Sequence, residues 1–153
     1  MKKLKSLILV TLAILVLAIP VARAQNADVK TRGLFVNLTT DDTWSAAKAI
    51  SFAHQKALKN GHKPVAIWLN VRAVYLADKK RPSHVHGLMR ENGKSIQDML
   101  KSFMADGGTV IMCSACSKAA GLGAADYIDG VEMGTWPRVE SILFDPGVTT
   151  LAW

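Results

Sequence analysis

Short apolar runs alternate with amphipathic segments over most of this chain, and this alternation limits the folds available to it. The segment that contains Ile96, Met99, Leu100 and Phe103 has the spacing of an amphipathic helix. The runs that predict buried strands lie at 33–38, 65–69, 109–112 and 148–153. Strands that alternate with helices form a mainly parallel sheet with right-handed crossovers. The sequence therefore predicts an α/β fold with helices on both faces of the sheet.

Capping and stop signals set the ends of the predicted helices. The polar residues at 39–42 precede a helix that ends at Asn60-Gly61. Ser95 and Asp98 have the spacing of a capping box, which predicts the start of a second long helix. Shorter helices are predicted at 71–77, 114–120 and 139–144, and a long loop at 78–93, whereas the pattern at 124–133 is ambiguous.

The first two dozen residues have the three parts of a secretory signal peptide. A basic start precedes an almost continuous apolar run from Leu7 to Ile19, and Ala22-Arg23-Ala24 supplies the small residues of a cleavage site. A membrane anchor needs about 20 apolar residues, and this run is shorter. We expect cleavage after Ala24, a flexible leader at 25–32 and one domain at 33–153. The mature protein is expected to be exported to the periplasm, with membrane contact only through the uncleaved signal peptide.

Cleavage changes the charge of the chain. The full sequence has 19 Lys and Arg residues against 12 Asp and Glu, a net charge of +7. Four of the basic residues and none of the acids lie in the signal peptide, so the mature net charge is +3. No dense basic stripe remains, and we therefore expect no nucleic-acid partner. The run Lys79-Lys80-Arg81 could attract an anionic sulfur compound, although a solvated loop is the more usual explanation of such a run.

The two cysteines, Cys113 and Cys116, form a CxxC motif where a predicted strand meets a predicted helix. They are too few for a disulfide scaffold, which indicates a local and chemical role. Unpaired N–H groups and the positive end of the helix favour a thiolate, the nucleophile of thiol–disulfide and sulfur-transfer chemistry. Other interpretations stay open: an inert disulfide, half of a metal site that lacks a second CxxC, and thioredoxin-like exchange at an unusually late position in the chain.

A second group of candidate ligands lies in the loop at 78–93. His84 and His86 are one residue apart, with Met89 nearby. Together with the two cysteines they would form a soft ligand set suited to Cu(I) or zinc. Ordinary exposed loop histidines explain the pair better, and we expect no metal site there.

Three further residues have weaker claims to a role in the site. Asp41 could act as a base near Cys113, but an acid at a helix start needs no such role. Trp44 and Trp68 fit a core or a subunit interface better than a platform for a ligand.

The order and spacing of seven segments match those of a known family: 33–41, the helix to Asn60-Gly61-His62, 65–69, 100–106, 108–116, Gly121 and 128–131. On these segments, nearly all of residues 33–153 resembles the DsrE/DsrF-like family. The resemblance implies a flavodoxin-like α/β sandwich, often assembled as trimers or hexamers. It also implies that the cysteine at the position of Cys113 carries sulfur as a persulfide along a relay. Most relay members are cytoplasmic, so the export signal argues against a role in tRNA thiolation.

Residues and resemblance together predict an exported protein that handles sulfane sulfur, as a persulfide carrier or in sulfur transfer, or performs thiol redox chemistry. Cys113 ends a strand and is expected to face the cleft and accept sulfur, while Cys116, closer to the body of the domain, resolves the product. Whether the protein is a carrier or a sulfurtransferase-like enzyme stays open. Two alternatives also stay open: a soft-metal-binding protein, and an oligomeric interaction module with an inert disulfide.

The expected partners follow from the same chemistry. They are a sulfur donor or acceptor protein, or a small sulfur compound, together with further copies of the chain in a homo-oligomer. We expect no bound cofactor.

Overall fold

The computed structural model of the chain describes residues 32–84 and 95–153. The predicted signal peptide, almost all of the predicted leader, His86 and Met89 lie outside the described residues. In the part of the chain that is described, no helix has the length and apolar character needed to cross a membrane.

A five-stranded sheet forms the centre of the fold, and all of its strand pairs are parallel. The strand order is β4-β3-β2-β1-β5. This arrangement confirms the predicted α/β class and four of its strands, while β4 lies in the stretch whose pattern was ambiguous. The strands are β1 (Gly33–Leu38), β2 (Val65–Leu69), β3 (Thr109–Cys113), β4 (Glu132–Gly134) and β5 (Val148–Ala152).

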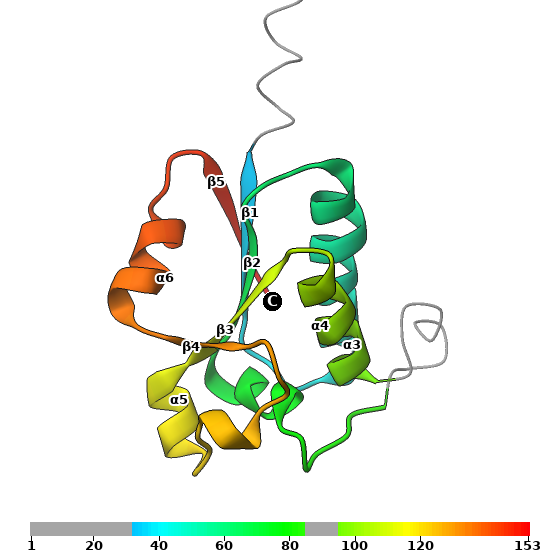
Figure 1. Ribbon diagram of the computed structural model, residues 1–153, viewed down its shortest axis with the longest axis vertical. Coiled ribbons are helices and arrows are strands. Elements are labelled where there is room, and N and C mark those ends of the chain that lie inside the picture. The colour runs from blue at the N-terminus through cyan, green and yellow to red at the C-terminus, as the bar shows by residue number, and fades with distance from the viewer. Residues whose placement is uncertain (1–31, 85–94) are drawn as a thin grey trace, which may run out of the picture. The chain divides into compact units, whose positions relative to one another are not determined.

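Helices cover both faces of the sheet, as predicted. Helices α3 (Thr43–Ser51) and α4 (Ile96–Ala105) lie on one face, and α6 (Trp136–Leu143) lies on the other (Figure 1). The remaining helical segments are the π-helical η2 (Phe52–Ala57), the 3-10 helices η3 (Leu58–Asn60), η4 (Val71–Ala77) and η6 (Ala124–Asp126), and the short helix α5 (Ser114–Ala119).

The predicted helix caps are present in the structure. The side chain of Asp42 accepts the N–H of Ser45 at 2.8 Å, and that of Ser95 accepts the N–H of Asp98 at 3.1 Å. The helical stretch that α3 begins ends at Gly61, whose φ of 87° is a left-handed conformation that glycine adopts without strain.

The two faces of the sheet bury cores of different size. Between the sheet and α3 and α4 lies the larger core, which includes Val36 and Phe103. Beneath α6 lies the smaller one, formed by Phe35, Ala66, Ile111, Val139 and Ile142. Neighbouring residues of β1, such as Phe35 and Val36, are therefore both fully buried, on opposite faces. This burial on both sides explains why the central strands appear in the sequence as unbroken apolar runs.

Candidate functional site

The carboxyl ends of β1, β2 and β3 bring three loops to one edge of the sheet, as the topology predicts. Asn70, which follows β2, donates from Nδ2 to Oδ1 of Asn37 in β1 at 3.3 Å. The thiol of Cys116 donates to Oδ1 of Asn70 at 3.1 Å. A chain of hydrogen bonds therefore runs along this edge from β1 to α5 and ends at a cysteine of the CxxC motif.

Cys113 is both the last residue of β3 and the N-cap of α5. Its Sγ accepts the N–H of Cys116 at 3.2 Å, and its carbonyl oxygen accepts the hydroxyl of Ser117 at 2.8 Å. The hydroxyl of Tyr127 in turn donates to Oγ of Ser117 at 2.7 Å, and both of these residues are buried. Two buried hydroxyls therefore fix the backbone of the CxxC motif from the interior side.

At Cys113 the N-terminal N–H groups of α5, which favour a thiolate, are opposed by burial. Burial raises the pKa of the Cys113 thiol, and the neighbouring Cys116 thiol raises it further. The backbone N–H groups of Cys116 and Ala115 act in the opposite direction but have the smaller effect. The N–H of Cys116 thus orients the Cys113 sulfur.

Cys116 lies one turn further along, against the start of η4. Its Sγ accepts the N–H of Val71 at 3.3 Å, and the same N–H lies 2.9 Å from Oδ1 of Asn70. Val71 has a φ of 50°, which is unusual for a β-branched residue. The surrounding contacts thus hold a strained backbone conformation next to the Cys116 sulfur.

A pocket of about 290 Å³ opens beside Cys116. The sequence predicts that Cys113 faces the cleft and that Cys116 lies nearer the body of the domain. At this pocket the two cysteines take the opposite places, because Cys116 lines the pocket and Cys113 does not. The N-cap contact of Cys113 turns its sulfur back toward α5, while Cys116 projects toward η4. The pocket is lined by Val71, Arg72, Tyr75, Cys116, Ala119 and Ala120.

Two arginines lie over one aromatic ring at this pocket. The guanidinium carbon of Arg81 is 4.2 Å from the centre of the Tyr75 ring, and that of Arg72 is 5.8 Å away. Arg72 also donates from Nε and Nη2 to the carboxylate of Asp41 at 3.0 and 2.6 Å. This hydrogen-bonded pair lowers the pKa of Asp41 and raises that of Arg72. Asp41 therefore binds Arg72, and no hydrogen bond among the described residues joins it to Cys113.

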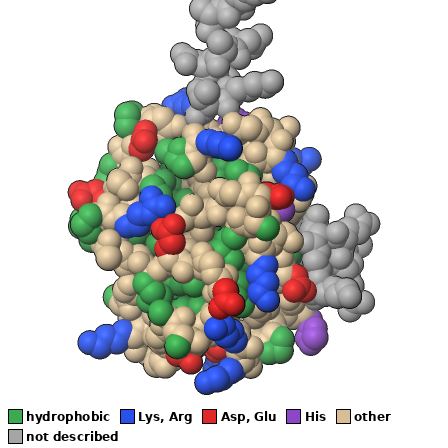
Figure 2. Space-filling model, in the orientation of Figure 1, with side chains coloured by type: hydrophobic (Ala, Val, Ile, Leu, Met, Phe, Trp, Pro, Cys, Tyr) green, Lys and Arg blue, Asp and Glu red, His purple; other side chains and the backbone are tan. Residues whose placement is uncertain are grey.

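The basic run at 79–81 is paired with acids, which favours the solvated-loop interpretation. Nζ of Lys79 lies 3.4 Å from Asp129, Nζ of Lys80 lies 3.6 Å from Asp126, and Nε of Arg81 lies 3.8 Å from Asp78. Basic and acidic side chains are likewise intermixed on the face that Figure 2 shows.

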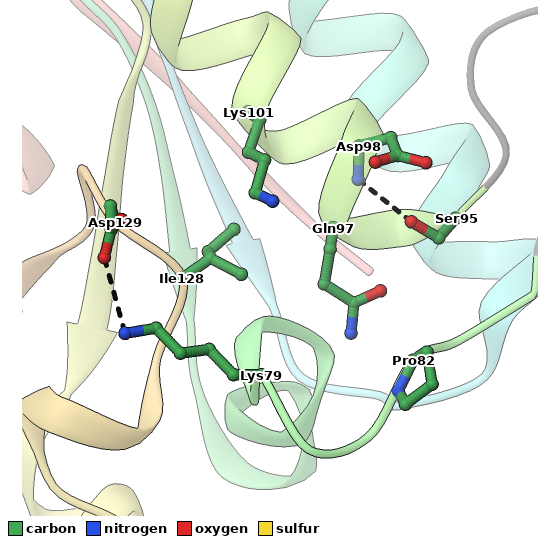
Figure 3. Close-up of a pocket in the computed structure, with 8 residues that line it drawn as sticks. All are labelled: Lys79, Pro82, Ser95, Gln97, Asp98, Lys101, Ile128 and Asp129. Atoms are coloured by element: carbon green, nitrogen blue, oxygen red, sulfur yellow. Dashed lines mark hydrogen bonds and ion pairs between the residues drawn. The ribbon is translucent and has the colours of Figure 1, made fainter.

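A second pocket, of about 390 Å³, lies beside the start of α4, where Lys79 reaches across to Asp129 (Figure 3). Lys101 and Asp98 also line it, so its charged side chains are two cations and two carboxylates. Gln97 belongs to the same wall, and its amide donates to the carbonyl oxygen of Arg81 at 2.7 Å. The mixed charge of this pocket does not select an anion, and its polar groups stabilise the neighbouring loop.

The described histidine of the loop forms no metal cluster. His84 pairs with Ser95 through an isolated antiparallel bridge. Across residues 32–84 and 95–153, no group of three or more His, Cys, Asp or Glu side chains is placed to hold a metal ion. Cys113 and Cys116 are free thiols.

The two tryptophans differ in their surroundings. Trp68 packs in the smaller core, with its ring centre 6.2 Å from that of Phe35. Trp44, by contrast, is 54% exposed. The core interpretation therefore holds for Trp68.

Several residues of the site carry no signal in the sequence. Ser117 and Tyr127 meet only because the chain folds back after α5, and Asn70 contacts Cys116 from the end of the neighbouring strand β2. The loop that begins at Asn70 follows a predicted strand and is expected at this edge, but the sequence does not predict the contact of Asn70 with Cys116. Arg72 and Tyr75 lie in a segment predicted only as a short helix.

Comparisons with known proteins agree on the fold. The model of the DsrE/DsrF-like family matches residues 34–144. No curated protein matches the sequence. Among solved structures, the crystal structure of the ychN protein from E. coli matches with a TM-score of 0.63 and 19% sequence identity. The match covers 80% of this chain and 99% of that one. At this identity the likeness shows the fold alone, a flavodoxin-like α/β arrangement.

Proposed function

Because the chain belongs to the DsrE/DsrF-like family, we propose that it handles sulfane sulfur, or performs thiol redox chemistry, through Cys113 and Cys116. The family supports a sulfur-relay-type role. The observation that carries the proposal for this chain is the placement of two free thiols at the carboxyl edge of the sheet, with Cys116 in a pocket wall and Cys113 one turn away.

The chemistry divides between the two thiols. A thiolate of the pair attacks the outer sulfur of a persulfide R–S–SH, a new S–S bond forms, and R–S⁻ leaves with the electron pair of the broken S–S bond. An acceptor thiolate that attacks this outer sulfur takes it over and restores the cysteine. Alternatively, the second cysteine attacks the inner sulfur, which forms the Cys113–Cys116 disulfide and expels HS⁻. An external dithiol then reduces the disulfide.

Mass spectrometry of the loaded protein tests this function. The reduced, desalted protein is exposed to polysulfide, and its intact mass is measured before and after treatment with a reductant. We expect the gain of sulfur that the reductant removes. The Cys113→Ser/Cys116→Ser variant is a matched control without any thiol, because the chain has only two cysteines. Equal gain by this variant, or no gain by the wild type, would contradict the proposal.

We further propose that residues 1–24 are a cleaved signal peptide and that the mature protein works in the periplasm. The support is the order of basic start, apolar run and small-residue cleavage site. N-terminal sequencing of protein from a periplasmic extract should begin at Gln25. Retention of Met1 in a membrane fraction would overturn this proposal.

We also propose that the protein is a homo-oligomer. The family resemblance supports a trimer or hexamer. Trp136 and Phe144 on the α6 side of the domain are 58% and 68% exposed, with ring centres 6.5 Å apart, and could form part of a subunit contact. Light scattering on the mature protein should give a multiple of the monomer mass, which replacement of both residues by serine should lower.

A further inference from the structure

The walls of the pocket beside Cys116 indicate what kind of compound fits there. Val71, Ala119 and Ala120 give it apolar surface, and Tyr75 adds an aromatic ring. Arg72 is the charged member of the six lining residues. The volume of the pocket, about 290 Å³, is near the lower end of the range for small-molecule sites. Such a pocket suits a small compound with an apolar body and one negative charge.

Arg72 has a free edge for an anion. Within the described part of the chain its hydrogen bonds use Nε and Nη2, both to Asp41, so Nη1 stays open. Arg81 adds a second cation over the Tyr75 ring. The carboxylates of Asp41 and Asp78 pair with Arg72 and Arg81 and offset their positive charge. Binding of an anion therefore depends on a direct contact with Nη1 of Arg72 more than on a net positive field.

The sulfur of Cys116 is also fixed in place. Its Sγ accepts the N–H of Val71 and its S–H donates to Oδ1 of Asn70, while Cys116 itself lines the pocket. Val71, whose φ of 50° is unusual, donates this N–H at 3.3 Å. An incoming compound therefore meets a sulfur in a defined position, beside a guanidinium group.

We propose that this pocket receives a small organic persulfide that bears a carboxylate, that Arg72 binds the carboxylate, and that Cys116 is the thiol that reacts first. This inference rests on the proposed function and names its substrate class. The Cys116 thiolate attacks the outer sulfur of R–S–SH and becomes Cys116–S–SH. The S–S bond of the compound breaks, R–S⁻ leaves with the electron pair, and the proton lost by the Cys116 thiol goes to solvent.

The test uses two aromatic disulfides that differ in charge. Dithiobis-nitrobenzoate carries carboxylates, and dithiodipyridine is neutral at the assay pH. Both react with a thiolate to give a mixed disulfide and a coloured thiol. The parent protein carries Cys113→Ser, so that Cys116 is its one thiol, and serine keeps a side-chain acceptor at the N-cap. The readout is the ratio of the rate constants for the anionic and the neutral reagent, which cancels changes in thiol reactivity.

We expect Arg72→Gln to lower this ratio about three- to tenfold, the effect of removing one charge about 4 Å from the reagent at a dielectric close to that of water. Arg72→Lys should retain most of the ratio, and Asp41→Asn should raise it. All of these differences should shrink at high salt. Lys59→Gln, which removes the same charge from η3 before the start of β2, is the control and should leave the ratio unchanged.

An unchanged ratio in Arg72→Gln, with the fold retained by circular dichroism, would overturn the role of Arg72. In a Cys116→Ser parent, the remaining Cys113 should react more slowly with the anionic reagent and should not respond to Arg72→Gln. Equal rates and equal sensitivity would overturn the assignment of Cys116. Neither reagent carries sulfane sulfur, so this assay tests the binding role of Arg72 independently of sulfur uptake. If the ratio depends on Arg72 but the protein takes up no sulfur from polysulfide, the proposed function fails while the anion-binding role of Arg72 stands.

Discussion

The buried hydroxyls behind Cys113 allow a quantitative prediction about how the CxxC motif is held. Tyr127→Phe removes one neutral hydrogen bond, to Ser117, and should cost about 1 kcal/mol of unfolding free energy. Ser117→Ala removes that bond and the bond to the carbonyl of Cys113, and it leaves the hydroxyl of Tyr127 without a partner in a side chain that is 1% exposed. Its cost should be about 2–4 kcal/mol, because a stranded buried hydroxyl adds about 1–3 kcal/mol.

The double variant should cost about 2 kcal/mol, since it loses both hydrogen bonds but strands no hydroxyl. The effects are therefore expected to be non-additive, with the double variant no less stable than Ser117→Ala alone. Urea unfolding in a reducing buffer, followed by circular dichroism, measures the three differences, and an unchanged m-value shows that the unfolding transitions are comparable. Additive costs, or a Tyr127→Phe variant as unstable as Ser117→Ala, would refute this account of the motif.

Three further predictions concern protonation and packing. Burial raises the pKa of the Cys113 thiol, so its alkylation rate should still increase with pH where the rate of free cysteine has reached its plateau. Peptide mass spectrometry separates the alkylation of Cys113 from that of Cys116. Since Arg72 lowers the pKa of Asp41 in the folded protein, wild type should exceed Asp41→Asn in stability by about 0.2–1 kcal/mol above pH ~3.9, the unfolded value. Urea midpoints should show this advantage disappearing as the pH falls through the lower, folded pKa. Gly134→Ala should cost about 1–3 kcal/mol in urea unfolding, because its Cβ would lie 2.7 Å from the carbonyl oxygen of Met112; a neutral result would contradict the close approach of β3 and β4.

The main elements of the fold could be predicted because their signals are local. Strands such as β1 are buried on both faces, which produces an apolar run, and Asp42 and Ser95 are helix caps with recognisable spacing. Strand β4 escaped this reasoning because three residues at a sheet edge, only partly buried, show no period. The π-helical segment Phe52–Ala57 likewise has the composition of an ordinary helix.

The candidate site was predictable in its position but not in its orientation. The CxxC motif at a strand end, followed by a short helix, locates both thiols at the carboxyl edge of the sheet. Which sulfur borders a pocket depends on where η4 packs, and the partners of the site, such as Asn70 and Tyr127, come from distant parts of the chain. The pKa of Cys113 depends on its burial, which is also a tertiary property.

Intact mass spectrometry of the protein isolated from its native compartment without reductant tests the central claim most directly. The account predicts a mature chain that begins at Gln25, part of which carries one additional sulfur atom that a reductant removes. Peptide mapping should place this sulfur on the segment that contains Cys113 and Cys116. A population with only an unreactive disulfide, or with a bound metal ion that accounts for the added mass, would contradict the claim that these thiols carry sulfur.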